Sequence, residues 1–328
     1  MSALLEVRDL RVCLPAGGGQ AAAVDGVSFA VDRGGVLGIA GESGSGKTMT
    51  GLALLGLTPP TARVTGSARL GDVELVGLSG RALRDLRGAR LAMVFQDPLT
   101  SLHPMLTVER QLTEHVRHHE RVPRRVARER AAELLDAVRI PDPRRALRAY
   151  PHQFSGGMRQ RIAIAMALAG RPEVLIADEP TTALDVTVQA GILRLLDRLR
   201  REHGLAMIVV THDLGVLSAL ADDVAVFYAG RIVERGAREQ VLGAPRHPYT
   251  RGLLDALPEG GRGGMQPIGG SAPALGEVPS GCPFHPRCPY AEEACPREHP
   301  PLAPVDDGRA LSCHVDPFAD DRVPVARR

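Results

Sequence analysis

Short, continuous apolar segments recur along the chain between stretches with helical periodicity. The clearest cover residues 36–40, 91–95, 174–177, 206–210 and 224–228. Apolar runs of this kind, without polar alternation, are typical of strands buried on both faces, as in a parallel sheet covered by helices. The pattern therefore predicts an α/β fold with a parallel-sheet core.

Three segments nearer the N-terminus have a different pattern. Residues 4–12, 27–31 and 65–75 alternate between apolar and polar positions, and glycines interrupt the last of them. Such alternation is typical of antiparallel strands with one solvated face. We expect these segments to form a small antiparallel β layer beside the parallel core.

The middle of the chain is helical and charged. Residues 107–149 follow a helical period, and we place a helical subdomain at about residues 97–165. Its clustered arginines are interpreted as a solvated helix face in preference to a specific anion site. They are Arg121, Arg124, Arg125, Arg128 and Arg130.

The composition changes sharply after Leu257. Residues 260–264 and 269–276 are rich in glycine and proline, and a segment that carries cysteines follows them. This change predicts a linker and a separate tail. The expected organisation is a main domain at residues 1–257 and an extension at residues 258–328.

Composition and charge limit the remaining classes of protein. The chain has 328 residues, 44% of them hydrophobic, which is enough for a large globular core. Its net charge of +2 does not favour nucleic acid as the main partner. The longest apolar stretch, residues 162–169, is far shorter than the roughly 20 residues of a membrane span, and residues 1–10 lack the features of a secretory signal. We expect a cytoplasmic protein.

A glycine-rich segment after the apolar run at residues 36–40 has the full pattern of a phosphate-binding loop, or P-loop. It reads Gly41-Glu42-Ser43-Gly44-Ser45-Gly46-Lys47-Thr48. Backbone N–H groups of such a loop surround phosphate oxygens, the lysine reaches the β and γ phosphates, and the Thr48 hydroxyl binds Mg²⁺. Lys47 is also the only lysine in the chain, which indicates a site that needs a compact ammonium group. The sequence predicts a site for a nucleoside triphosphate.

Two adjacent carboxylates, Asp178 and Glu179, follow the apolar run at residues 174–177. This is the arrangement of a Walker B motif. Adjacent residues of a strand point in opposite directions, so the two acids can have separate roles. We expect Asp178 to hold Mg²⁺ and Glu179 to polarise the attacking water.

A third motif distinguishes this chain from other P-loop proteins. Phe154-Ser155-Gly156-Gly157-Met158, followed by Arg159-Gln160-Arg161, resembles the signature motif of the ATP-binding-cassette (ABC) family. Physically it is a second helix N-terminus, at which Ser155 and the glycines expose backbone donors to a γ-phosphate. The resemblance implies that residues 1–257 form an ABC ATPase domain, and that the signature of one subunit completes the P-loop site of another. A monomer would then hydrolyse ATP poorly.

The other motifs of the family follow in order. Gln96, the segment Ala183-Leu184-Asp185 and His212 come after successive apolar runs. The resemblance implies that Gln96 contacts Mg²⁺ and the attacking water, that Asp185 contacts the opposite subunit, and that His212 touches the γ-phosphate. Two positions depart from the family: Met158 stands where glutamine is usual, and Leu14 stands where an aromatic residue normally stacks on adenine.

Local resemblance narrows the family further. Three segments are similar to parts of oligopeptide and dipeptide permease ATPases. They are Gln96-Asp97-Pro98-Leu99-Thr100-Ser101-Leu102-His103-Pro104, His247-Pro248-Tyr249-Thr250 and the cysteine-bearing tail. The resemblance implies an ATP-hydrolysing, energy-coupling subunit of an importer, bound at the cytoplasmic face of the membrane. Its partners would be two transmembrane permease subunits, a second ABC ATPase or a second copy, and indirectly an extracellular substrate-binding protein.

Three other functions share part of this pattern. ABC ATPases for nickel and other solutes have the same local segments, so the cargo stays open. Soluble ABC ATPases that act on ribosomes or DNA commonly carry two cassettes or a coiled-coil insertion, and this sequence has neither. An exporter ATPase would leave residues 247–249 and the tail unexplained, so the importer is the favoured interpretation.

Four of the five cysteines lie in the tail, at Cys282, Cys288, Cys295 and Cys313. Cytosolic proteins rarely use disulfides, so the cluster predicts a zinc or iron–sulfur centre, with plain reduced thiols as the third possibility. The permease resemblance implies a [4Fe–4S] cluster. Cys13, alone near the N-terminus, is expected to be a small buried hydrophobe.

Overall fold

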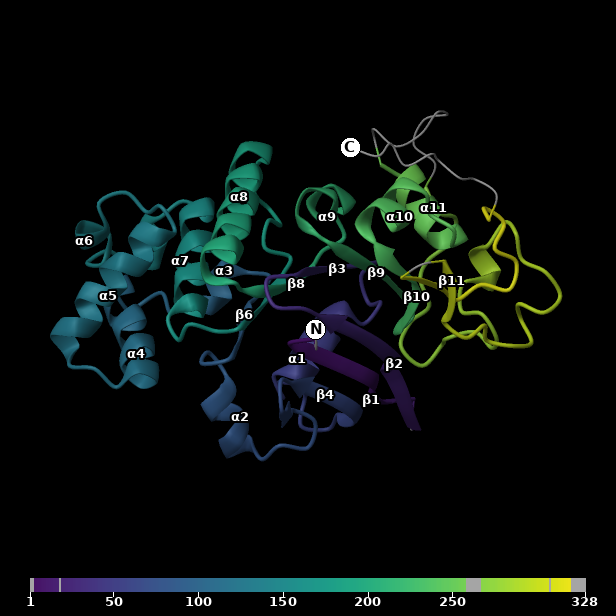
Figure 1. Cartoon of the computed structure of the whole chain (residues 1–328), viewed down its shortest axis with the longest axis horizontal. Helices are drawn as coiled ribbons and strands as arrows, with labels where there is room; N and C mark the ends of the chain where they lie inside the picture. Colours follow the sequence, from purple (N-terminus) through teal and green to yellow (C-terminus); the bar gives the residue numbers. More distant parts are fainter. Residues whose placement is uncertain (1–2, 18, 258–266, 307, 320–328) are drawn as a thin grey trace. The chain divides into compact units, whose positions relative to one another are not determined.

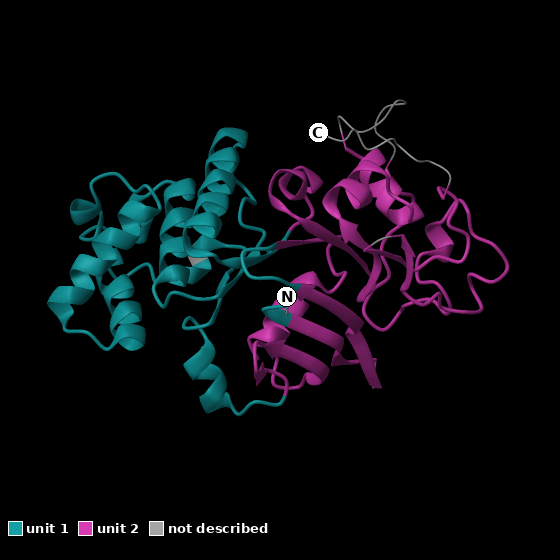
Figure 2. Ribbon diagram, in the orientation of Figure 1, with its two compact units in different colours: residues 1–5, 31–35, 77–210 teal, residues 6–30, 36–76, 211–328 magenta. Residues whose placement is uncertain are grey.

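The computed structural model describes residues 3–17, 19–257, 267–306 and 308–319. Figure 2 colours the two compact units into which the chain divides. Both units are assembled from separate stretches of sequence. Unit 1 comprises residues 1–5, 31–35 and 77–210, and unit 2 comprises residues 6–30, 36–76 and 211–328.

Unit 1 contains a parallel sheet. Its strands are β6 (Leu91–Val94), β7 (Val174–Asp178) and β8 (Ala206–Val210), and β7 pairs in parallel with both of the others. Every residue of β7 and β8 is buried, as expected for apolar runs with no polar alternation. The parallel strands predicted for this part of the chain are therefore confirmed.

Helices make up most of the rest of unit 1, and α4 to α7 lie together in Figure 1. Side chains cap three of the longer ones at their N-termini, where Thr107, Ser155 and Asp185 each accept a backbone N–H of the first turn. Three of the clustered arginines, Arg125, Arg128 and Arg130, pair with acids of the same region, for example Arg125 with Glu129 at 3.2 Å, as expected for a solvated face. The helices are α2 (Gly80–Leu86), α3 (Pro98–Ser101), α4 (Val108–Glu120), α5 (Arg124–Ala137), α6 (Pro143–Ala146), η1 (Pro151–Gln153), α7 (Gly156–Leu168) and α8 (Val186–His203).

Unit 2 contains the predicted β layer, in the strand order β2-β1-β4-β5. The strands are β1 (Leu5–Ala16), β2 (Gly19–Val31), β4 (Arg63–Leu70) and β5 (Val73–Glu74). The single segment expected at residues 65–75 is two antiparallel strands. They separate because Gly71, with φ of 61°, makes a left-handed turn between them.

The second set of strands in unit 2 is mixed, because antiparallel strands that the sequence did not predict extend the parallel pairing. Strand β3 (Val36–Ala40) pairs in parallel with β9 (Asp223–Tyr228). β9, β10 (Arg231–Ala237), β12 (Arg309–Leu311) and β11 (Ala303–Asp306) then pair successively in antiparallel fashion. The helices of unit 2 are α1 (Lys47–Leu54), α9 (Leu214–Leu220), α10 (Arg238–Gly243), α11 (Pro248–Asp255) and η2 (His285–Arg287).

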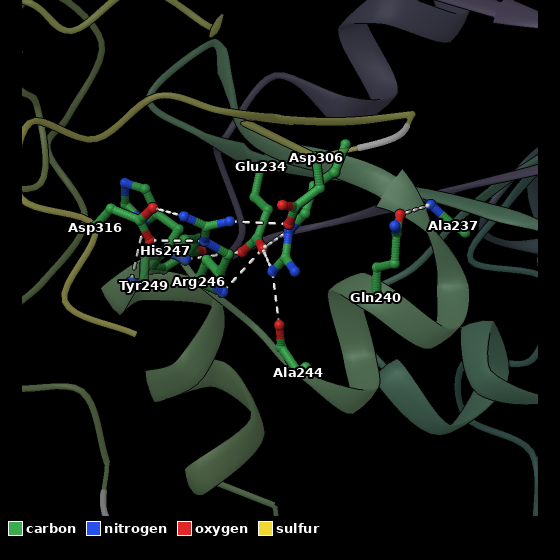
Figure 3. A network of polar contacts seen from close by, with 10 residues as sticks. Glu234, Ala237, Gln240, Ala244, Arg246, His247, Tyr249, Asp306 and Asp316 are labelled. Carbon is green, nitrogen blue, oxygen red and sulfur yellow. Dashed lines mark hydrogen bonds and ion pairs between the residues drawn. The ribbon is translucent and has the colours of Figure 1, made fainter. Parts of the chain in front are cut away.

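Within unit 2, a buried ion pair joins the tail to the strands that precede it. Arg309 of β12 and Glu234 of β10 are 4% and 0% exposed, and the Arg309 guanidinium donates to the Glu234 carboxylate. The same carboxylate accepts the backbone N–H groups of Arg246 and His247 at 2.9 and 3.0 Å (Figure 3). The tail is thus paired into a sheet and not held by a linker alone.

The glycine-rich linker is only partly described. Residues 260–264 lie outside the described residues, and residues 269–276 form neither helix nor strand. No helix in the described ranges combines the length and the apolar character that a bilayer-spanning helix requires.

Candidate functional site

The P-loop lies in unit 2 between β3 and α1, as the sequence predicts. Gly41, Gly44 and Gly46 have φ values of 145°, 79° and 98°, which side chains other than glycine rarely adopt. A Cβ on Gly41 would lie 2.3 Å from the Phe227 carbonyl oxygen. The chain therefore needs glycine at these positions to turn its backbone into α1.

Lys47 is buried at the start of α1, with 6% exposure. Its Nζ donates to the carbonyl oxygens of Gly41 and Glu42, both at 2.7 Å. The ammonium group is thus fixed against the first two residues of the P-loop. An anion bound there would meet a desolvated positive charge together with the N-terminus of α1.

The Walker B carboxylates lie in unit 1, at the end of β7. Asp178 is the last strand residue and is 2% exposed. Glu179 follows with φ of 46°, and its N–H donates to the Val210 carbonyl at 2.8 Å. Its Oε2 accepts hydrogen bonds from Gln96 Nε2 at 3.1 Å and from Thr182 Oγ1 at 2.6 Å. The structure therefore brings the Gln96 amide and the Glu179 carboxylate into direct contact.

The signature segment forms the first turn of α7, also in unit 1. Ser155 Oγ accepts the N–H of Met158 at 3.3 Å and caps the helix. Gly157 is buried, and a Cβ at this position would lie 2.4 Å from Val188 Cγ1 on α8. Asp185 caps α8 and accepts the Val188 N–H at 2.9 Å. The packing of α8 on α7 thus helps to fix the signature segment.

The predicted site residues divide between the two units. Unit 2 carries the P-loop and the exposed His212, whereas unit 1 carries Gln96, the Walker B acids, the signature segment and Asp185. Leu14 stands where the family usually has an aromatic residue that stacks on adenine, and it is half-buried on β1.

Sequence reasoning missed three residues that contact the motifs: Thr182 on Glu179, and Tyr249 and Arg287 on Glu42. Thr182 lies three positions after Glu179, so its spacing was a usable signal. Tyr249 stands in a segment that the sequence singled out for its resemblance alone. No pattern along the chain relates Arg287 to the P-loop, which lies 245 positions earlier.

The four cysteines of the tail line one cavity of about 10 Å³ in unit 2, with His247 and Phe284 among its other walls. Backbone N–H groups of Glu292 and Asp316 lie 3.4 Å from the sulfurs of Cys295 and Cys313. None of these cysteines is in a disulfide. Burial raises the pKa of the Cys288 thiol to about 11, so the protonated form is favoured in the absence of a cation.

For the predicted metal centre, the residue types fit a metal ion or cluster, but their arrangement in the structure does not. Four convergent thiols are the donor set of an iron–sulfur or structural zinc site. Yet the described residues contain no group of three or more His, Cys, Asp or Glu side chains arranged to hold a metal ion. A cavity of about 10 Å³ holds one water molecule at most, so the thiols would have to move to bind a cluster.

Cys13 corrects a smaller expectation. It is half-buried on β1, not buried. The reason is that the second half of β1, from Cys13 to Ala16, lies largely outside the core.

Two family models match this chain. The model described as "ABC transporter" matches residues 24–182, and the model described as "Oligopeptide/dipeptide transporter, C-terminal region" matches residues 233–295. Among curated proteins, the chain is 48% identical over 314 residues to the oligopeptide transport ATP-binding protein OppD of Salmonella typhimurium, covering 94% of this chain and 93% of OppD. It is 46% identical to the dipeptide transport ATP-binding protein DppD of Bacillus subtilis, covering 95% of each chain.

Solved structures are similar over the ATPase part of the chain. The ATP-binding cassette MJ0796, in a dimeric post-hydrolysis state bound to ADP and Pi, is 28% identical with a TM-score of 0.64, covering 71% of this chain and 98% of that one. The protein cbiO1 of Clostridium perfringens, part of an ABC transporter complex, is 27% identical with a TM-score of 0.63, covering 74% and 92%.

Proposed function

The chain belongs to the ABC transporter family, and from this premise we propose that it is the ATP-hydrolysing subunit of an importer for oligopeptides or dipeptides. One observation carries the proposal. Nearly the whole chain aligns at 48% identity with an oligopeptide transport ATP-binding protein, an alignment that includes the C-terminal part matched by the oligopeptide/dipeptide transporter model. ABC ATP-binding subunits hydrolyse ATP to ADP and phosphate, so the chain is an ATPase.

The motifs assign roles in this reaction. The P-loop backbone and Lys47 bind the phosphates of ATP, because they offer N–H donors and a buried ammonium group. Hydroxyl, carboxylate and amide oxygens suit Mg²⁺, and Thr48, Asp178 and Gln96 supply them. The metal would neutralise charge on the phosphates during hydrolysis.

Glu179 acts on the attacking water. Gln96 and Thr182 hold its carboxylate in one orientation, from which it accepts a proton from water. His212 contacts the γ-phosphate in this proposal. Both roles are expected from the motifs, and the Glu179→Gln variant described below tests the first of them.

The working form is a dimer. Ser155, Gly156, Gly157 and Met158 face the ATP of a second subunit, and Asp185 contacts that subunit. The related cassette MJ0796 is dimeric with ADP and Pi bound, which supports this arrangement. The second subunit is a similar ABC ATPase or a second copy of this chain.

Membrane passage belongs to other chains in this proposal. Because no described helix is suited to cross a bilayer, two transmembrane permease subunits would carry the peptide. The ATPase would bind them from the cytoplasmic face of the membrane, and an extracellular binding protein would deliver the peptide to them.

Purification from membranes tests the proposal. A tagged full-length chain should co-purify with two membrane proteins and a second ABC ATPase, and an untagged strain provides the control. Co-purification with ribosomes or DNA would contradict the importer. In the reconstituted complex, peptides and nickel can be compared as stimulants of ATP hydrolysis, and stimulation by nickel alone would contradict peptide cargo.

We further propose that Cys282, Cys288, Cys295 and Cys313 bind a [4Fe–4S] cluster, with zinc as the alternative. The four thiols already line one cavity, and two of them lie against backbone N–H donors. Such donors stabilise thiolate sulfur. The cluster would hold the tail together and would take no part in ATP hydrolysis.

A further inference from the structure

The tail makes a direct ion pair with the P-loop. Arg287, in η2, donates from Nη1 to Glu42 Oε2 at 2.7 Å and from Nη2 to Glu42 Oε1 at 2.9 Å. The Arg287 side chain is 7% exposed and that of Glu42 is 26% exposed. A bidentate pair that is mostly shielded from water is stronger and more directional than a surface ion pair.

Arg287 is itself fixed before it reaches Glu42. Its Nε donates to the Gly269 carbonyl at 2.8 Å. Its guanidinium carbon lies 5.8 Å from the centre of the Tyr228 ring and 5.9 Å from that of Phe284. The Glu42 carboxylate, with a smaller contribution from the Tyr228 hydroxyl, raises the pKa of Arg287, so the guanidinium stays charged.

Tyr249 makes a second contact with the same P-loop residue. Its hydroxyl accepts the Glu42 N–H at 2.8 Å. The Tyr249 ring is fully buried and packs against Tyr228 and Phe284, with ring centres 4.6 and 5.3 Å away. Burial raises the pKa of the Tyr249 hydroxyl, so it stays neutral and able to accept this hydrogen bond.

Every polar group of Glu42 is therefore held. Tyr249 accepts its N–H, Lys47 donates to its carbonyl at 2.7 Å, and Arg287 binds its carboxylate. A carboxylate in a loop that receives phosphates would otherwise repel them. Pairing with Arg287 neutralises that charge, and it fixes the Glu42 carboxylate against the tail.

We propose that Arg287 and Tyr249 are positioning residues that hold the P-loop in its ATP-binding conformation, and that Arg287 does so by neutralising the Glu42 carboxylate, which would otherwise repel the phosphates. This inference rests on the proposed function, because it requires that the loop binds ATP. It assigns the C-terminal extension a role in nucleotide affinity in addition to its own fold. Arg287 lies between Cys282 and Cys288, so the segment that holds the P-loop is also the segment that the cysteines would anchor.

Titration of the full-length protein with Mg-ATP tests the inference. Arg287→Met should raise the dissociation constant about tenfold, the loss expected for one charge-assisted pair that leaves a carboxylate unneutralised. Arg287→Lys should lie between Arg287→Met and the wild type, because an ammonium group keeps the charge but not the bidentate geometry. Tyr249→Phe keeps the ring and should weaken binding several-fold by removing the acceptor of the Glu42 N–H.

A double variant separates charge from general damage. Glu42→Gln combined with Arg287→Met should bind Mg-ATP more tightly than Arg287→Met alone, because no unpaired carboxylate remains. Loss of tail structure alone would leave the double variant as weak as the single one, and that result would overturn the inference. Arg297→Met, which changes an exposed arginine of the same tail, is the matched control and should bind like the wild type.

The outcomes also distinguish this inference from the proposed function. If the wild type does not bind Mg-ATP, the proposed function fails. If the wild type binds and Arg287→Met binds equally well, only the positioning role is overturned. If Arg287→Met fails to fold, as judged by thermal unfolding without nucleotide, then Arg287→Lys and Tyr249→Phe decide, and wild-type affinity in both would overturn the inference.

Discussion

Glu179 has an uncommon backbone conformation, and hydrogen bonds hold its side chain in one orientation. Its φ of 46° lies in the left-handed region, and its Oε2 accepts two hydrogen bonds. A non-glycine residue in this conformation carries a cost that functional sites commonly bear. The strained backbone of Glu179 thus lowers the stability of the fold, while its carboxylate is held in one orientation.

Glu179→Gln should lower ATP turnover by at least about 100-fold, because an amide keeps the shape but cannot accept a proton from water. ATP binding should persist, and the ATP-bound dimer should accumulate. Turnover can be measured on the assembled transporter, and the dimer by size exclusion with Mg-ATP against ADP. Glu129→Gln on the exposed face of α5 is the control, and unchanged turnover in Glu179→Gln would exclude the catalytic role.

Lys47 is the second residue whose chemistry depends on its shape. The side chain is buried, and its Nζ fits between two carbonyl oxygens at 2.7 Å. Lys47→Arg should weaken Mg-ATP binding about tenfold or more, because the larger planar guanidinium cannot occupy a space formed around an ammonium group. Equilibrium titration measures this effect. The reverse exchange at an exposed position, Arg63→Lys, should have no effect, and near-normal affinity in Lys47→Arg would contradict the argument.

At the scale of elements, burial decided which strands could be predicted. β3, β7 and β8 are buried at every residue, so their apolar runs stand out in the sequence. β12 was missed because it has three residues and begins with Arg309. Arg309 looks like a surface residue in sequence, but its pairing with the fully buried Glu234 allows it to enter the sheet.

The first turn of α7 offers a test that separates packing from chemistry. A Cβ on Gly157 would lie 2.4 Å from Val188 Cγ1, whereas one on Gly156 would lie 3.5 Å from Leu184 Cδ2, an ordinary contact. Gly157→Ala should therefore lower the free energy of unfolding by about 1–3 kcal/mol, because the β-branched Val188 cannot move easily. Denaturant unfolding measures the change.

Gly156→Ala is the matched variant for this prediction. It should leave the free energy of unfolding within about 0.5 kcal/mol of the wild type and should lower ATP turnover if the first turn of α7 faces a phosphate. Val188→Ala in the Gly157→Ala background should recover part of the lost stability. Equal unfolding of the two glycine variants would show that α8 does not constrain the signature segment.

At the scale of the whole molecule, the motifs were predictable and the contacts between distant segments were not. Each motif is a short pattern that can be recognised without the fold, so roles for Lys47, Asp178 and Ser155 could be predicted from the sequence, and they stay predictions. The pairing of Arg287 with Glu42 joins positions 245 residues apart. An arginine in a proline-rich tail has no signature in one sequence, and only the fold brings it to the P-loop.

The four tail cysteines are spread over residues 282–313, yet they line one cavity. Their thiols converge, but the cavity of about 10 Å³ is smaller than any cluster. The [4Fe–4S] proposal therefore requires that the thiols separate when the cluster binds and that they bind as thiolates. Both changes are local, because Cys282, Cys288 and Cys295 lie in a region with little regular structure.

Protein purified without oxygen should accordingly be brown, with about four iron and about four sulfide per chain. Replacing any of Cys282, Cys288, Cys295 and Cys313 by serine should remove the colour, because each supplies one of the four ligands. Cys13→Ser is the control and should stay brown, since Cys13 lies on β1 and does not line the cavity. Absorbance and metal analysis give the readout. A colourless protein with one zinc per chain would replace the iron–sulfur centre with a four-cysteine zinc site, and a protein with neither metal would leave the cysteines as reduced thiols.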